Sequence, residues 1–165
     1  CNGILFNHES PIRGETFGTT KIVRALCHLK KNGTGRLYLG NLYAKRDWGH
    51  AKDYVIAMWK MMQKKIPDDY VIATGVQYSV KDFLNIVAQE LNFKIIWKGK
   101  GLLEKGYINN KLIISIDQRY FRPTEVESLL GDSRKARKKL GWNPQFDINK
   151  LVKDMIHQEL KKHSD

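Results

Sequence analysis

An α/β fold is predicted, because strand-like and helix-like segments alternate along the chain and because the chain has the size of one compact unit. The strand-like segments are short and apolar, whereas the helix-like segments carry apolar residues at spacings of three and four. With 165 residues, of which 42% are hydrophobic, the chain can bury one substantial core. We therefore expect strands and helices packed as layers around that core.

The first half of the chain predicts helices and strands in alternation. The stretch "CNGILF" reads as a buried strand, and Thr19 or Thr20 then caps a helix that ends at Gly33. The strand "RLYLGN" follows. A second helical pattern runs from Ala51 towards Pro67, which cannot continue a helix, and "DYVIATG" predicts another buried strand.

The second half continues the alternation. Ser79 with Asp82 resembles a capping box that begins a third helix, and "KIIWKG" predicts the strand after it. Residues 99–111 carry Gly and Asn and are the most loop-like part of the chain, and "LIISID" predicts the next strand. Asp132 caps a short helix that ends at Gly141, and a last amphipathic helix covers residues 151–160. We find no internal repeat.

The formal charge of +12 and the pI near 9.7 raise the possibility of a nucleic-acid partner. The sequence has no zinc finger, no helix-turn-helix and no interleaved basic and aromatic motif. Much of the charge falls near the ends of predicted helices, where cations complement the helix dipole: Lys30-Lys31, Lys64-Lys65, Lys138-Lys139 and Lys161-Lys162. We therefore expect no specific nucleic-acid partner.

The remaining composition favours a cytoplasmic protein. No segment approaches the length of a membrane span, so we expect no membrane partner. Cys1 and Cys27 offer neither a disulfide framework nor a metal spacing, which favours a reducing compartment. Because the first residue is Cys1 and "CNGILF" reads as the middle of a strand, we expect the sequence to be part of a longer chain.

Polar residues follow the first predicted strand in "FNHESPIRG". Ligands bind outside the carboxyl ends of strands in open α/β sheets, so Asn7, His8 and Arg13 could face a ligand. The alternative is a local turn, in which Asn7 and Ser10 bond to nearby backbone and His8 packs.

Two further arginines favour a phosphorylated ligand. Arg46 lies in "RDWGH", between a strand and a helix, and Arg122 precedes Glu125 in "YFRPTEVESLLGD". A guanidinium binds diphosphate through paired hydrogen bonds, and the helix start in "GETFGTTK" adds amide donors. The alternative is an ion pair of each arginine with Asp47 or Glu125. In "RDWGH" we interpret Trp48 as core and His50 as packing at the helix start.

Several stretches together identify a family: "NGILFNHESP" with "RGETF" and "TKI", "LYLGN" with "RDWGHAKDYV", "VIATG" with "SV", "RYFRPTEVESLLGD" and "KLGWNP". They resemble, in this order, the C-terminal half of the GDP-mannose 4,6-dehydratase family of extended short-chain dehydrogenase/reductases. The resemblance implies the C-terminal part of an NAD(P)-binding Rossmann-type fold. Residues 1–165 then supply C-terminal sheet strands plus the lobe that binds GDP-sugar, and the N-terminal dinucleotide-binding part is absent from this chain.

The resemblance also implies an activity and partners. Family members convert GDP-mannose to GDP-4-dehydro-6-deoxy-D-mannose and water by internal hydride transfer through NADP, on the route to deoxy sugars such as GDP-fucose. They are homo-oligomers, either dimers or tetramers. The alternative function is a non-catalytic module that binds nucleotide sugars or polyanions.

The family's catalytic Tyr-x-x-x-Lys helix and its glycine-rich loop precede the matched part, so we expect no catalytic residue in this chain. Tyr107 and Lys111 in "YINNK" have the right spacing, but Gly106 and the two asparagines between them predict a turn instead of a helix. The glycines of "GKGLLEKG" have the wrong spacing for a dinucleotide loop. No metal site is expected.

The binding residues implied by the resemblance are assigned position by position. His8 and Arg13 match cofactor contacts. The substrate contacts match Asn7, Arg13, Gly14, Glu15, Thr16, Phe17, Lys21, Gly40, Arg46, Arg122, Pro123, Thr124 and Glu125.

Three positions depart from the family pattern. The family usually has Arg where Ile12 stands, and Val and Arg where Gly18 and Thr20 stand. The loss of two cations from this loop bears on cofactor affinity and on tetramer packing, to which the loop contributes in relatives.

Overall fold

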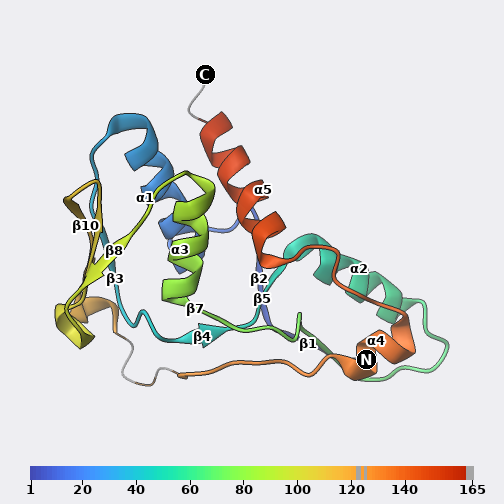
Figure 1. Cartoon of the computed structure of the whole chain (residues 1–165). Coiled ribbons are helices and arrows are strands. Elements are labelled where there is room, and N and C mark those ends of the chain that lie inside the picture. Colours follow the sequence, from blue (N-terminus) through green and yellow to red (C-terminus); the bar gives the residue numbers. More distant parts are fainter. Residues whose placement is uncertain (122–123, 125, 163–165) are drawn as a thin grey trace.

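The structure, a computed structural model, describes residues 1–121, 124 and 126–162. It is elongated, with a sheet at one end and helices in the middle and at the other end (Figure 1). The helices are α1 (Gly18–Asn32), α2 (Ala51–Met62), α3 (Val80–Glu90), α4 (Arg134–Leu140) and α5 (Ile148–Lys161), with 3-10 turns η1 (Gly101–Leu103) and η2 (Gln118–Tyr120). The strands are β1 (Gly3–Leu5), β2 (Asn7–Glu9), β3 (Leu37–Leu39), β4 (Lys45–Arg46), β5 (Trp48–His50), β6 (Tyr70–Ile72), β7 (Tyr78–Ser79), β8 (Ile96–Lys98), β9 (Lys105–Ile108) and β10 (Lys111–Ile116).

The strands form one four-stranded sheet and three strand pairs. The larger sheet has the order β3-β10-β9-β8, in which β3 runs parallel to β10 and the other neighbours are antiparallel. β1 pairs with β6 and β2 with β5, both in parallel, and β4 pairs with β7 in antiparallel. Parallel pairs joined through helices confirm the predicted α/β class.

We call α1, α3, α5 and the four-stranded sheet the three-helix lobe. Its core contains Phe83, Leu84 and Val87 of α3, none of which is accessible to solvent, and α1 and α5 pack onto it. Trp48 of β5 joins this core, with its ring 5.1 Å from that of Phe83. The interpretation of Trp48 as a core residue is confirmed.

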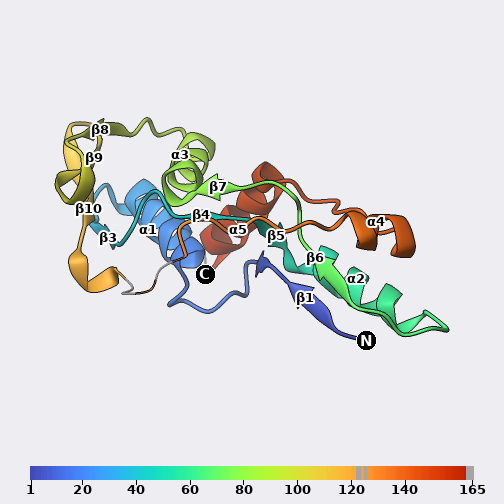
Figure 2. The ribbon, with the colours of Figure 1, turned by 90° about the horizontal axis from the view of Figure 1, so that it is seen from below.

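We call α2, α4, β1 and β6 the two-helix lobe, which lies at the other end of the molecule (Figure 2). Tyr54, Ile72 and Trp142 are fully buried there in a second core. The Trp142 indole donates a hydrogen bond to the carbonyl of Asp53, 2.8 Å away, and the Asp53 carboxylate accepts from two backbone amides of the segment before α5. The segment that leads to α5 is thereby fixed to α2.

The side chain of Asp47 accepts hydrogen bonds from the backbone of two other segments of the chain. Asp47 is fully buried, and its oxygens accept hydrogen bonds from the amides of Thr74 and Gly75, both at 2.9 Å, and from the amide of Gly131 at 3.3 Å. Asp47 is therefore engaged with backbone donors, which accounts for its burial without invoking an ion pair with Arg46.

Several local predictions are confirmed. The capping box of Ser79 and Asp82 is present at the start of α3, and Gly33 and Gly141 end their helices in the left-handed conformation. His50 caps α2, because its Nδ1 accepts from the Lys52 amide at 3.1 Å. Short-range signals of this kind depend on only a few neighbouring residues.

Two helix starts differ from the prediction. Neither Thr19 nor Thr20 caps α1, which begins at Gly18, because the Thr19 hydroxyl instead donates to the buried Glu9 carboxylate at 2.7 Å. Ser133, not Asp132, occupies the cap position of α4, although the Asp132 carboxylate accepts from the Arg134 amide at 3.0 Å.

The prediction of a loop at residues 99–111 is wrong. This stretch contains η1 and the strand β9, which pairs with β8 on one side and β10 on the other. Asn109 and Asn110 have positive φ angles of 48° and 61° and make the tight turn between β9 and β10. The Asn residues therefore mark a hairpin turn.

Among the described residues, no helix is long and apolar enough to cross a bilayer.

Candidate functional site

Several of the predicted binding residues line two separate cavities. The first, which we call the β3 cavity, has a volume of about 350 Å³ and includes the predicted Thr16, Lys21 and Gly40. Its other lining residues are Gly18, Tyr38, Leu39, Asn41, Val80, Arg119, Tyr120 and Phe121. The second, the β2 cavity, has about 340 Å³ and is lined by Ile4, Leu5, Phe6, Asn7, His8, Arg13 and Leu129.

The β3 cavity carries two cationic side chains. The Lys21 ammonium donates to the carbonyl of Tyr38 at 2.7 Å and lies 3.7 Å from the centre of the Tyr120 ring. The Arg119 guanidinium is oriented by Asp117, to which Nη2 donates at 2.7 Å and Nε at 3.1 Å. The cavity therefore combines positive charge with aromatic surface, a combination suited to a nucleotide.

Gly40 has a packing role in this cavity. A Cβ atom at this position would lie 2.3 Å from the carbonyl oxygen of Tyr120, closer than any real contact. Only glycine allows the turn after β3 to approach η2 so closely. Any side chain at Gly40 would push the two walls of the cavity apart.

His8 and Arg13 line the β2 cavity together with Asn7. The Nδ1 atom of His8 lies 2.9 Å from the carbonyl oxygen of Phe6, and since a carbonyl only accepts, Nδ1 carries the proton. In the neutral ring, Nε2 is then an acceptor. The His8 ring also packs against Tyr54, with ring centres 5.2 Å apart, so this histidine is both packed and able to accept from a ligand.

Arg13 lines this cavity beside the buried Glu9 carboxylate. Its Nε lies 3.4 Å from a Glu9 oxygen, and its guanidinium stacks 3.7 Å from the Phe17 ring centre. Within the described part of the chain, this Nε is buried and has no hydrogen-bond partner. Burial raises the pKa of the Glu9 carboxyl, although the Thr19 hydroxyl and Arg13 act in the opposite direction. The Arg13 side chain as a whole is 24% exposed, so part of this cation remains accessible to an anionic ligand in the β2 cavity.

Arg46 lies on β4, opposite Tyr78 of β7, and its Nη1 donates to the carbonyl of Lys45 at 2.8 Å. The segment that pairs with β4 reaches Leu129 in the β2 cavity, and β7 leads into Val80 in the β3 cavity. Arg46 itself lines neither cavity.

The remaining predicted residues have different surroundings. Glu15 lies outside both cavities and forms an exposed ion pair with Arg24 at 2.6 Å, and this contact lowers the pKa of its carboxyl. Gly14 accepts from the Phe17 amide at 3.2 Å within the loop before α1. Thr124 is exposed. Arg122, Pro123 and Glu125 lie outside the described residues.

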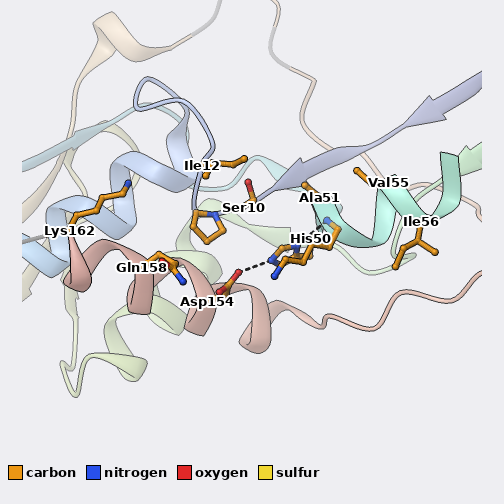
Figure 3. A pocket seen from close by; sticks show the side chains of 11 residues that line it. Ser10, Ile12, His50, Ala51, Val55, Ile56, Asp154, Gln158 and Lys162 are labelled. Atoms are coloured by element: carbon orange, nitrogen blue, oxygen red, sulfur yellow. Dashed lines mark hydrogen bonds and ion pairs between the residues drawn. The ribbon is translucent and has the colours of Figure 1, made fainter. Parts of the chain in front are cut away.

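The largest cavity described is elsewhere and contains none of the predicted residues. It has about 700 Å³ and lies between the loop of residues 10–12, α2 and α5 (Figure 3). At its base the Nε2 of His50 lies 2.9 Å from an Asp154 oxygen. Because both nitrogens of His50 have protein partners, this histidine packs and caps, as interpreted from the sequence.

Sequence reasoning missed Arg119 and the aromatic residues Tyr38 and Tyr120 as lining residues. Arg119 stands three positions before Arg122 in the same motif, which was the available signal. Tyr107 and Lys111 lie on the adjacent strands β9 and β10, so the prediction that they do not share one face of a helix is confirmed. No group of metal-ligating side chains was found among the residues described.

Comparisons with known proteins place the chain in a family. A sequence model of the family described as GDP-mannose 4,6 dehydratase matches residues 1–155. A GDP-mannose 4,6-dehydratase of Vibrio cholerae is 49% identical over 173 residues, which cover 98% of this chain and 46% of that protein. GDP-mannose 4,6 dehydratase 2 of Caenorhabditis elegans is 49% identical over 161 residues, covering 97% and 42%. The chain thus spans less than half the length of these relatives.

Solved structures share the fold at low identity. RMD from Pseudomonas aeruginosa, complexed with NADPH, superposes with a TM-score of 0.75 at 16% identity, covering 96% of this chain and 47% of that one. UDP-glucuronic acid 4-epimerase from Bacillus cereus gives a TM-score of 0.73 at 12% identity, covering 98% and 45%. The fold is therefore a portion of the epimerase and dehydratase fold of extended short-chain dehydrogenase/reductases. By the match over residues 1–155, this chain belongs to the GDP-mannose 4,6-dehydratase family.

Proposed function

We propose that this chain is the substrate-binding half of an NADP-dependent GDP-mannose 4,6-dehydratase. The intact protein would convert GDP-mannose to GDP-4-dehydro-6-deoxy-D-mannose and water. The observation that carries the proposal is the family match over residues 1–155 together with the β3 cavity, in which Lys21 and Arg119 stand beside a wall that only Gly40 permits.

The GDP end of the substrate would occupy the β3 cavity. Lys21 and Arg119 would bind the diphosphate, because each presents N–H donors and a positive charge. Arg46, on β4, would approach the same diphosphate together with Arg122. Replacement of either Arg46 or Arg122 by Ala in the intact protein should then weaken binding by about 1.5–3 kcal/mol, the range for hydrogen bonds to charged groups.

NADP would be held at the β2 cavity by His8 and Arg13. The fit is supported by the partly exposed, positively charged Arg13 side chain, which lines this cavity, and by the acceptor Nε2 of His8. When bound, NADP would supply hydride acceptance from C4 of the hexose and hydride return to C6. Asn7, beside His8 on β2, would contact the sugar end of the substrate.

The intact protein would be a homo-oligomer, either a dimer or a tetramer, in the cytoplasm. The exposed apolar residues of α2, among them Trp59 and Met62, supply surface for association. The free thiols of Cys1 and Cys27 fit a reducing compartment.

A second candidate is a non-catalytic module that binds nucleotide sugars or polyanions. It is favoured by the net charge of +12 and by the position of Tyr107 and Lys111 on two strands of a hairpin instead of on one helix. We expect only weak, unspecific binding to duplex DNA that falls steeply with salt. Sub-micromolar, sequence-selective binding in a gel shift at ordinary salt would favour this second candidate instead.

The decisive experiment is a product assay. The intact protein is incubated with GDP-mannose and NADP, and the 4-keto product is measured. Turnover by the intact protein supports the enzyme, whereas GDP-mannose binding without turnover supports the module. Residues 1–165 alone should be inactive, and turnover by this chain that disappears with Tyr107→Phe would contradict the assignment of catalysis to another part of the protein.

A further inference from the structure

A buried carboxylate beside the β3 cavity has no part in ligand binding as described above. Glu104, at the end of η1, is only 3% exposed. One of its oxygens accepts from the Lys81 ammonium at 2.6 Å, and the other accepts from the Tyr43 hydroxyl at 2.6 Å. Burial raises the pKa of the Glu104 carboxyl, but these two hydrogen bonds outweigh it and hold the pKa below its ordinary value. Glu104 is therefore a charged group with both oxygens engaged.

The two partners of Glu104 flank the wall of the β3 cavity. Tyr43 ends the turn after β3, and its amide donates to the side chain of Asn41, which lines the cavity, at 2.9 Å. Lys81 lies in the first turn of α3, next to the lining residue Val80, and its amide donates to the carbonyl of Leu42 at 2.9 Å. None of Tyr43, Lys81 and Glu104 lines the cavity itself.

The network does not belong to the apolar core. Tyr43 is 54% exposed as a residue, and the Lys81 side chain is 24% exposed, so water can reach both if Glu104 is changed. Loss of the carboxylate would therefore free the turn of residues 40–43 without leaving the Lys81 ammonium buried and without a hydrogen-bond acceptor. The expected consequence is a less ordered cavity wall, with the core of the three-helix lobe left intact.

We propose that Glu104 is a positioning residue for the β3 cavity: through Tyr43 and Lys81 it fixes the turn of residues 40–43 against the start of α3. The identity of the ligand rests on the function proposed above. The order of the turn does not depend on that function, because it is a property of the protein without ligand.

The test uses the intact protein with Glu104→Gln and Tyr43→Phe, and with Glu90→Gln as a matched control. Glu90 pairs with Lys153 at 3.9 Å at the far end of α3, away from the cavity. Glu104→Gln should raise the KM for GDP-mannose about fivefold, with kcat and the KM for NADP unchanged, because it weakens the order of one wall only. Tyr43→Phe should act in the same direction, and the double variant should add little to Glu104→Gln. Glu90→Gln should behave as the wild type.

Hydrogen exchange without ligand separates this inference from the proposed function. The amides of Val80 and Lys81, which bond to residues 44 and 42, should exchange about tenfold faster in Glu104→Gln and at the wild-type rate in Glu90→Gln. If the wild-type protein does not bind GDP-mannose, the proposed function is wrong, and the exchange rates still decide the role of Glu104. Unchanged exchange at both amides, or a loss of kcat and of NADP affinity as large as the rise in KM, would overturn the inference.

Discussion

The two lobes bury their apolar residues to different degrees. In the three-helix lobe the apolar faces of α1, α3 and α5 meet one another around a single core. In the two-helix lobe α2 packs inward through Tyr54 and Ala57, but its outer face leaves Trp59 62% and Met62 78% exposed. Val55, Ile56 and Met58 of the same helix are also exposed. One lobe thus depends on its own packing, whereas the other offers an apolar surface for further contact.

The largest effect is expected from a cavity in the three-helix lobe. Phe83→Ala should lower the free energy of unfolding by about 3–5 kcal/mol, because the side chain has no solvent exposure and packs against Trp48. Val55→Ala on the exposed face of α2 should change it by less than about 0.5 kcal/mol. Urea denaturation followed by circular dichroism measures both. Equal losses of unfolding free energy in Phe83→Ala and Val55→Ala would show that the buried and the exposed apolar side chains of the two lobes do not differ in their contribution to stability.

A second comparison concerns two lysines with similar hydrogen bonds. Lys21 donates to the carbonyl of Tyr38 at 2.7 Å in the three-helix lobe, and Lys60 donates to the carbonyl of Gly141 at 2.6 Å in the two-helix lobe. Lys21→Met in the intact protein should weaken GDP-mannose binding by about 1.5–3 kcal/mol, because it removes a cation from the β3 cavity. Lys60→Met should leave the affinity unchanged. Isothermal titration calorimetry that gives the same affinity for Lys21→Met as for the wild type would remove Lys21 from the site.

The exposed face of α2 predicts self-association of residues 1–165. Within the described part of the chain β1 pairs only with β6, and an apolar parallel strand with one open edge promotes further pairing. Trp59→Glu with Met62→Lys should reduce the associated fraction in sedimentation velocity while changing the free energy of unfolding by less than about 0.5 kcal/mol. A monomeric wild-type chain at high concentration would contradict this prediction.

The smallest effect is a pH dependence from Glu9 between the lobes. Burial raises the pKa of its carboxyl above the ordinary 4.5, so the folded protein binds this proton more tightly than the unfolded chain does. The stabilisation is complete below pH 4.5 and is lost as the pH rises from there through the folded-state pKa. Glu9→Gln should remove this part of the decline, because Gln cannot ionise. Denaturation series from pH 4 to pH 8 that run parallel for the two proteins would exclude it.

Sequence reasoning succeeded where the signal is local. The capping box of Ser79 and Asp82 and the glycines that end α1 and α4 depend on residues within one turn. It failed at residues 99–111, because β9 is a strand only through its pairing with β8 and β10, which no local pattern records.

The candidate site was predictable only in part. The family motifs gave Lys21 and Gly40, which the structure brings into one cavity. They gave no indication that the Thr19 hydroxyl would bond to Glu9, or that Glu104 would reach Tyr43 across 61 positions of sequence. Contacts of this kind arise from the tertiary fold, so spacing along the chain cannot reveal them.

Hydrogen exchange of the intact protein with and without GDP-mannose tests the central claim most directly, since it reports both lobes in one measurement. If GDP-mannose binds in the β3 cavity, its binding should slow exchange in residues 16–21, 38–41 and 118–121, which border the cavity. Exchange in α4 should not change. Protection confined to α2 and α4, with none at residues 38–41 or 118–121, would show that the sugar nucleotide does not bind in the β3 cavity.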